Sequence, residues 1–513
     1  MSEFISRWQT TGSSQTITLP YESTGTYSGT IDWGDGLVSA NTYVNRSHVY
    51  SVASSYTITI SGTVTGFRTE LMGAAPALAL REVLKWGPLR GLNNSNVAMF
   101  SGCSNLVLTG VTDTPDLSGI TATTSMFRSC SSATTISGVS SWNTADVVDM
   151  SYMFNGTTNF NDNIGSWNVS GVTNMSYMFN SSSQFNNGGN SSISGWNVSN
   201  VTNMEGMFRF GSFNQDIGAW DVGNVTTMEV MFYHQTNISG TGFNNGGSPS
   251  ISGWNVSNVT NMIEMFRGAK IFNQPIGNWN VSGVTSMFGM FTNQGGGTNP
   301  FNQNIGAWNV SGVTDMRQMF ASSSFNNGGS SSISGWNVSN VTLITLMFSG
   351  ARSFNQPIGS WDMTNKTDLT RMLDDARVFN QDVGSWNVSG VTNMTGLFRD
   401  THAFNNGGSP SISGWNVSNV TDMSSMFGNT DTIAQPFNQP IGSWNVSSVQ
   451  NMSGMFNRCT SFNQNISSWN TSGVTNMSSM FLFATVFNQN IGSWNTDNVT
   501  LMNSMFQSAI AFN

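Results

Sequence analysis

Apolar residues return along most of the chain at a fixed spacing, which is typical of a repeat protein. Tryptophan occurs at 14 regularly placed positions from Trp142 to Trp494, mostly 25 or 29 residues apart. Twelve residues after each of them stands the last residue of a Met-x-x-Met-Phe motif, as Phe179 follows Trp167. Because this stretch never changes length, the pattern predicts a solenoid of stacked coils, each packed only on its neighbours.

The constant stretch contains two patterns that predict secondary structure. Its Trp-Asn-Val segment alternates apolar and polar residues and predicts a short strand, whereas the i, i+3, i+4 spacing of Met-x-x-Met-Phe predicts a short helical or 3₁₀ turn. Asn, Asp, Ser or Thr stands before this motif in 12 of the 14 repeats, which is typical of a helix N-cap. The Asn or Asp after each Trp is interpreted as a ladder of hydrogen bonds between coils.

Changes of length are confined to two places and predict surface loops. Seven residues separate Phe from Trp in most repeats, but the separation is 11 after Phe185, Phe243, Phe325 and Phe404. Extra residues also follow the motif at Phe232, Phe291 and Phe427. Two irregular copies, at Met99-Phe100 and Met126-Phe127, bring the expected number of coils to about 16.

The first 69 residues do not share the repeat. Residues 16–19 and 56–60 alternate in the manner of strands, and the sequence Asp32-Trp33-Gly34-Asp35-Gly36 lies between them, followed by His48-Val49-Tyr50. This module resembles PKD-type β-sandwich domains, which implies a spacer or interaction module. Asp32 and Asp35 are interpreted as turn residues, with a calcium site as the less favoured alternative, so no cofactor is expected.

The repeat itself, Phe-Asn-Gln-x-Ile-Gly-x-Trp-Asn-Val-Ser-x-Val-Thr-Asn-Met-x-x-Met-Phe, resembles the BspA-like leucine-rich repeats of bacterial surface proteins and mycoplasma lipoproteins. The resemblance covers roughly residues 95–513 and implies a right-handed solenoid used for adhesion or display. The expected fold is therefore mainly β. It divides into a PKD-like sandwich over residues 1–69, a cap or linker over 70–98, and the solenoid over 99–513.

Charge is scarce, and this excludes several classes of protein. Lys, Arg, Asp and Glu make up 8% of the residues, and 17 basic against 26 acidic residues give a net charge of −9. An acidic chain lacks the basic surface that nucleic acid requires. No apolar run is long enough for a membrane span, and no export signal is seen at Met1. A virion or an extracellular cell surface is the expected location.

The few charged and aromatic residues gather at the variable positions within and after the motif. They predict one variable edge, interpreted either as a solvated face or as a recognition strip. Lys366 is exceptional because it stands where the other 13 repeats have Val, so an inward Lys must find a partner or bend outward. The candidate binding residues are Arg209, Tyr233, Arg267, Lys270, Arg317, Arg352, Lys366, Arg371, Arg377 and Arg399.

Evidence for catalysis or metal binding is weak in the sequence. Glu205 and Glu229 share a register in successive repeats and form the one pair of carboxylates that suits a glycosidase. Glutamates at such positions are more commonly ordinary exposed surface residues. The three histidines lie in unrelated contexts. Cys103 and Cys130 occupy small, buried-type positions of adjacent repeats, and whether they bridge is left open. No catalytic or metal-binding residue is expected.

The resulting hypothesis is a non-enzymatic surface recognition or structural protein. A virion appendage, such as a phage tail fibre, is the first expectation, a secreted bacterial adhesin the alternative, and a tailspike-like glycan-cleaving enzyme the second alternative. The expected partners are a host-surface glycan or protein and other structural proteins of the same surface. A homo-oligomer stays open, and neither nucleic acid nor membrane insertion is expected.

Overall fold

The computed structural model describes residues 3–72, 74–90, 98–234, 242–293 and 297–513. The chain divides into two compact units, Met1–Asn258 and Val259–Asn513, and each is described by itself. Among the described residues, no helix has the length and apolar character needed to cross a membrane.

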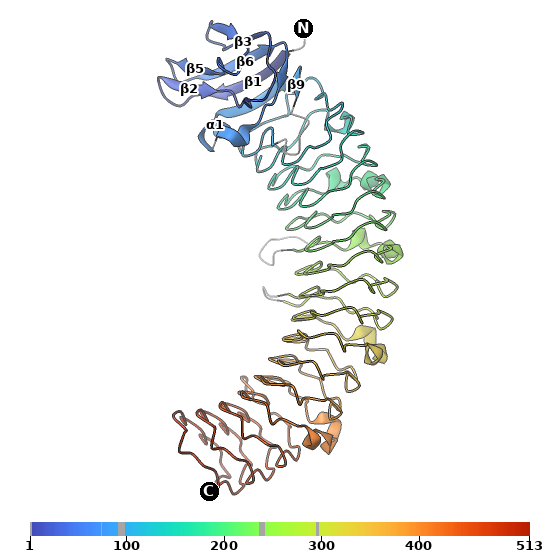
Figure 1. Cartoon of the computed structure of the whole chain (residues 1–513), viewed down its shortest axis with the longest axis vertical. Coiled ribbons are helices and arrows are strands. Elements are labelled where there is room, and N and C mark those ends of the chain that lie inside the picture. The colour runs from blue at the N-terminus through green and yellow to red at the C-terminus, as the bar shows by residue number, and fades with distance from the viewer. Residues whose placement is uncertain (1–2, 73, 91–97, 235–241, 294–296) are drawn as a thin grey trace. The chain divides into compact units, whose positions relative to one another are not determined.

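The N-terminal module is a set of small sheets (Figure 1). Its principal sheet has the strand order β4-β3-β6-β1-β8, while β2 pairs with β5 and β7 with β9. The elements are β1 (Glu3–Gln9), β2 (Gln15–Thr18), β3 (Thr30–Asp32), β4 (Val38–Ala40), β5 (Ser47–Tyr50), β6 (Ser55–Ser61), β7 (Val64–Thr65), η1 (Thr69–Met72), α1 (Ala74–Ala79), β8 (Leu80–Lys85) and β9 (Leu89–Arg90).

Alternation along β1 explains why this sheet forms. Phe4, Ser6 and Trp8 are buried on one face, and β1 pairs antiparallel with β6 in the register Phe4↔Ile60. The strands predicted at 16–19 and 56–60 are confirmed as β2 and β6. The stretch predicted as a cap contributes β8, which pairs with β1 and also forms a parallel bridge, Glu82↔Val107, to the first repeat.

Successive repeats are joined by single-residue parallel bridges. In the first unit these run Asp149↔Asn174 and Asn174↔Asn203, at the residue before the motif. No Trp-Asn-Val segment is a strand in the described part of the chain, so that prediction is wrong. The alternation there reflects burial alone: Trp167 and Val169 face the core, but the backbone between them does not pair.

The Met-x-x-Met-Phe motif is a β-turn, and the predicted helical turn is wrong. The Met178 amide donates to the Met175 carbonyl (3.2 Å), and Tyr177, the third residue of the turn, has a φ of 54°. In each described repeat from Met150 onward this position has positive φ. The residues are Tyr152, Tyr177, Gly206, Val230, Glu264, Gly289, Gln318, Leu346, Arg371, Gly396, Ser425, Gly454, Ser479 and Ser504.

The amides of the motif serve the next repeat. Met175 donates to the Asn203 carbonyl and Tyr177 to the Glu205 carbonyl, at 3.0 and 2.7 Å. A helix would leave these first amides without an internal partner too, so the positive φ at the third position is what excludes a helix. The predicted capping contact nevertheless exists, because Asn174 Oδ1 accepts from the Ser176 amide at 3.0 Å.

The 11-residue Phe–Trp segments form pairs of short 3₁₀ helices, where surface loops are predicted. In each unit they lie along one side of the repeats (Figure 1). Asn187 is fully buried there: its Oδ1 accepts from the Ile164 amide of the preceding repeat, and its Nδ2 donates to the Asn190 carbonyl. The helices of these segments are η3 (Asn187–Gly189), η4 (Ser191–Gly195), η5 (Asn245–Gly247), η6 (Pro249–Gly253), η7 (Asn327–Gly329), η8 (Ser331–Gly335), η9 (Asn406–Gly408) and η10 (Pro410–Gly414). A further 3₁₀ helix, η2 (Val139–Ser141), lies outside these segments, before Trp142.

An asparagine ladder connects the repeats, but not at the predicted position. The Asn after Trp instead serves a bend, since Asn168 Oδ1 accepts from the Ser170 amide of its own repeat. The ladder is formed by the Asn after Phe: Asn161 Oδ1 accepts from the Asn186 amide at 2.7 Å, and Asn186 Oδ1 from the Asn214 amide at 2.9 Å.

Stacked rings form the core. Phe127, Phe154 and Phe179 lie in successive repeats with ring centroids 5.6 Å apart. Small residues that follow the motif Phe turn inward and donate to the preceding repeat, as Ser182 Oγ does to the Phe154 carbonyl. Cys130 fills the same position and donates to the Phe100 carbonyl, and both it and Cys103 are buried free thiols.

Candidate functional site

Charged residues from three consecutive repeats and one extended loop line an open pocket of about 310 Å³ in the second unit. We call it the Arg–Asp pocket. It contains three of the predicted arginines together with four aspartates that are not among the predicted binding residues. Its lining residues are Ser322, Ser349, Gly350, Arg352, Asp374, Asp375, Arg377, Arg399, Asp400, Thr430 and Asp431.

Backbone pairing brings these side chains together. The Asp375 amide donates to the Arg399 carbonyl and the Gly350 amide to the Asp374 carbonyl, both at 2.7 Å. Equal positions of successive repeats are therefore neighbours. Asp375 and Asp400 have φ angles of 53° and 56°, which lie in the left-handed region that asparagine and aspartate tolerate better than most residues.

Two aspartates take the short ion pairs. Arg399 binds Asp374 through Nε and Nη2, both at 2.8 Å, and the Asp374 side chain is 6% exposed. Burial raises the pKa of Asp374, against the opposing effect of Arg399. Asp375 accepts from Arg352 (2.8 Å) on one oxygen and from Arg377 (2.7 Å) on the other. This network fixes the arginine side chains in place.

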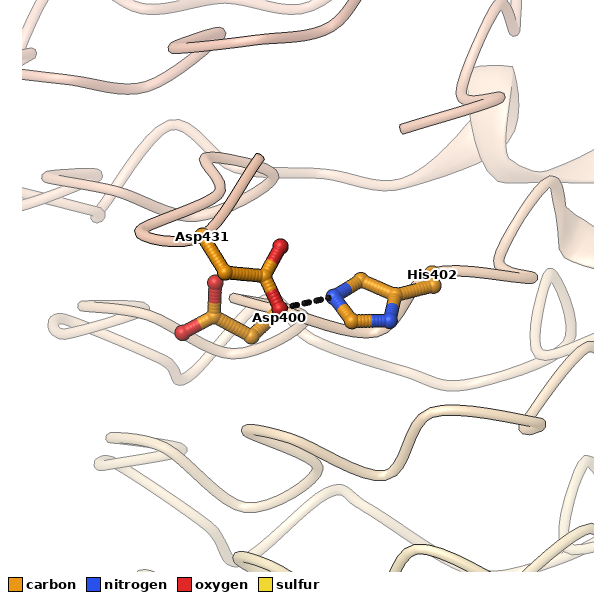
Figure 2. Close-up of side chains that lie close together, drawn as sticks. All are labelled: Asp400, His402 and Asp431. Carbon is orange, nitrogen blue, oxygen red and sulfur yellow. Dashed lines mark ion pairs between the residues drawn. The ribbon is translucent and has the colours of Figure 1, made fainter. Parts of the chain in front are cut away.

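The other two aspartates are held less tightly by cations. The closest Arg contacts are 3.6 Å for Asp400 with Arg399 and 3.8 Å for Asp431 with Arg377. His402 Nε2 lies 3.2 Å from Asp431 Oδ2, the contact drawn in Figure 2. Four aspartates and three arginines among the described lining residues leave one excess negative charge when His402 is neutral.

The remaining predicted arginines make local contacts outside the pocket. Arg209 lies over the rings of Phe210 and Tyr233, 4.1 and 5.3 Å from their centroids. Arg267 forms an ion pair with Glu264, and Arg317 one with Asp315.

Two predicted residues, Lys270 and Arg371, are half-buried and do not line the pocket. The candidate residues therefore form several small groups, of which the Arg–Asp pocket is the one that spans consecutive repeats.

Lys366 does not belong to the binding edge, which corrects its assignment as a candidate binding residue. It is fully buried, and its Nζ donates to the Val338 carbonyl of the preceding repeat at 2.6 Å. Burial lowers its pKa to about 8, while Asp362 acts in the opposite direction. The inward direction follows from the register, since the other repeats place Val there.

The other sequence candidates have structural contacts. Glu205 Oε1 accepts from the Tyr177 hydroxyl at 2.6 Å, and Glu229 lies at the equivalent position of the next repeat. In the N-terminal module Asp32 accepts from the Gly34 amide and Asp35 from the Leu37 amide, as turn residues do.

Sequence reasoning found the arginines but missed their partners and His402. A signal was present, because Arg352, Arg377, His402 and Asp431 each stand four residues after the end of their motif in four consecutive repeats. The extra residues after Phe427 were noted as an insertion, but the position of Asp431 was not recognised.

Comparison with known proteins identifies the repeat region. No curated protein and no solved structure matches the chain. Six overlapping segments, 94–192, 189–245, 236–331, 295–411, 327–436 and 407–513, match one family, so the match extends over nearly all of the chain beyond residue 93. The chain is therefore a member of the repeat family described as "Mycoplasma protein of unknown function, DUF285".

Proposed function

We propose that this chain is a non-enzymatic recognition protein of a virion or cell surface. In this proposal its repeats form a right-handed solenoid that presents the Arg–Asp pocket to a surface glycan. The PKD-like N-terminal module serves as spacer or attachment. The observation that carries the proposal is the pocket itself, where consecutive repeats depart together from the repeat pattern.

The departure is clear from comparing repeats with one another. Four residues after the motif, most repeats carry a hydroxyl or other uncharged residue, as at Thr158, Ser183 and Thr460. Only at Arg352, Arg377, His402 and Asp431 do consecutive repeats carry a charged or titratable side chain there, and they do so in four repeats in a row. A stack needs none of them for its core, so ligand recognition is the better reason for their grouping.

The chemistry of the pocket favours a neutral, hydroxyl-rich ligand. Its volume of about 310 Å³ falls at the lower end of sites for small ligands. Arg and Asp offer fixed donors and acceptors side by side, and their ion pairs hold them in place before binding, which lowers the entropic cost of binding. A polyanion or polycation would meet like charges in half of the pocket. A sugar unit would meet none.

Two settings fit this role. A phage virion appendage is our first choice and a bacterial adhesin the second, and the genes beside the coding sequence distinguish them: capsid and tail genes favour the first, secretion genes the second. The glycan-cleaving alternative assigns Glu205 and Glu229 to catalysis. This alternative requires that the wild-type chain cleaves a host glycan and that Glu205→Gln abolishes the cleavage.

Glycan-array and whole-cell binding test the proposal. We expect the wild-type chain to bind a defined set of glycans and the double variant Asp375→Asn/Arg377→Gln to lose that binding. Arg317→Gln is the matched control, since Arg317 lies on the same edge but pairs with Asp315 in its own repeat. Absence of glycan binding by the wild type, or equal binding by the double variant, would refute the proposal.

A further inference from the structure

We propose that Asp400, His402 and Asp431 bind a divalent transition-metal ion, with zinc as the best match. One ligand atom from each of the three side chains lies within 4.8 Å of the other two. Ligands about 2.0–2.2 Å from a tetrahedral zinc ion lie about 3.3–3.6 Å from one another, so the most distant of these atoms would approach by up to about 1.5 Å on binding. Figure 2 shows Asp431 and His402 facing each other, with Asp400 beside Asp431.

His402 provides the strongest evidence. Its side chain is 10% exposed, and its Nε2 makes no hydrogen bond although the atom is buried. The contact with Asp431 at 3.2 Å is an ion pair without hydrogen-bond geometry. Buried polar atoms are nearly always satisfied. A metal ion between His402 and the carboxylates would accept the Nε2 lone pair and remove this deficit.

The charge balance also favours a cation at this end of the pocket. Asp374 and Asp375 take the Arg contacts of 2.7–2.8 Å, whereas Asp400 and Asp431 have Arg contacts of 3.6 and 3.8 Å. The uncompensated negative charge of the pocket therefore lies on the two aspartates beside His402. A bound cation would neutralise it.

Hydrogen bonds from the backbone and a threonine already orient the two carboxylates. Thr430 donates its amide and its hydroxyl to the two oxygens of Asp400, at 2.5 and 2.7 Å. The Ile433 amide donates to Asp431 Oδ1, which leaves Oδ2 toward His402. Each carboxylate oxygen keeps a second lone pair, and outer hydrogen bonds of this kind are usual around metal ligands.

The ligand types indicate which ion would bind. One imidazole nitrogen with two carboxylates suits zinc or a neighbouring transition metal, with water completing the coordination. Calcium and magnesium prefer oxygen ligands throughout and would gain nothing from His402. This inference does not depend on glycan recognition, because the metal would bind with or without that ligand.

Isothermal titration of the metal-free full-length chain with zinc chloride tests the inference. We expect one zinc ion per chain, weaker binding of calcium, and a loss of at least about tenfold in zinc affinity for His402→Gln and for Asp431→Asn. His48→Gln is the matched control, because His48 pairs with Asp35 at 2.7 Å in the N-terminal module and should leave zinc affinity unchanged.

Three results would overturn the inference: no zinc binding by the wild type, unchanged affinity in both variants, or a loss of affinity in His48→Gln that equals theirs. Thermal melting of each variant verifies folding. If His402→Gln does not fold, Asp431→Asn decides, since Asp431 lies on an extended loop. Glycan binding is measured separately, so failure of one proposal is distinct from failure of the other.

Discussion

The turns after Phe179 and after Phe398 have the same backbone conformation but different side chains: the first is uncharged and the second is charged. Ser181 and Asp400, two residues beyond each Phe, have φ angles of 58° and 56°, and each donates its amide to a carbonyl of the following repeat. Ser182 and Thr401 both turn inward and donate to the preceding repeat. Only the outward residues differ.

This comparison separates two roles by position within the repeat. Amides, rings and small inward hydroxyls build the stack in both places. The outward positions carry no such requirement, so one repeat has Asn180 and Ser183 where the other has Arg399 and His402. Predictions follow for each role, from the largest expected effect to the smallest.

Removing the ring should damage both turns equally. Phe179→Ala and Phe398→Ala each delete a fully enclosed ring, so each should lower the free energy of unfolding by about 3–5 kcal/mol. Urea unfolding of the two variants measures this. A much smaller loss for Phe398→Ala would mean that the charged repeats are packed differently.

Replacing the buried cation should stabilise the chain in a pH-dependent way. The folded-state pKa of Lys366 is about 8, below the ordinary lysine value of 10.5, so the unfolded chain binds more protons between pH 8 and 10.5. Wild-type stability should therefore rise with pH across this window, and Lys366→Met should gain about 2–3 kcal/mol at pH 7.

The gain from Lys366→Met should vanish above pH 10.5, where Lys366 is neutral in both states. Unfolding at pH 7 and at pH 10.5 checks both statements. An unchanged stability together with weaker glycan binding would instead give Lys366 a functional role.

Breaking the tightest ion pair of the pocket should have a smaller cost. Asp374→Asn keeps the shape but removes the charge that Arg399 binds through two nitrogens, and about 1–3 kcal/mol should be lost. Asp375→Asn should cost less, because Arg352 and Arg377 are more exposed. Equal effects of the two substitutions in thermal melting would contradict this ranking.

The sequence was sufficient for the repeat and its core. The regular Trp, Met, Val and Phe positions are almost all buried, as predicted. A fixed spacing of apolar residues indicates which side chains face inward. The backbone conformation was not predictable from that spacing, since i, i+3, i+4 contacts close a helical turn and a β-turn equally well. Tyr177 shows the difference, with a positive φ at a position that a helix would keep negative.

The site was predictable in part. Charge at the variable positions of the repeat identified Arg352, Arg377 and Arg399. Of their partners, Asp374, Asp375 and Asp400 stand at regular positions of the repeat and were passed over, because the spacing does not say which charged side chains pair. Asp431 belongs to a repeat with extra residues, and the path of those residues is not contained in the repeat period. Lys366 was noticed as a departure, but its hydrogen bond to Val338 depends on the stacking of two repeats.

One measurement tests the separation of roles most directly. The variant Asp375→Ser/Arg377→Ser/His402→Ser gives the pocket the residues found at Ser181 and Ser183 of the ordinary repeat. We predict that its unfolding free energy stays within about 1–2 kcal/mol of wild type, because none of the three side chains belongs to the aromatic core, while glycan binding is lost. Unchanged glycan binding by this variant in its folded state would contradict the account.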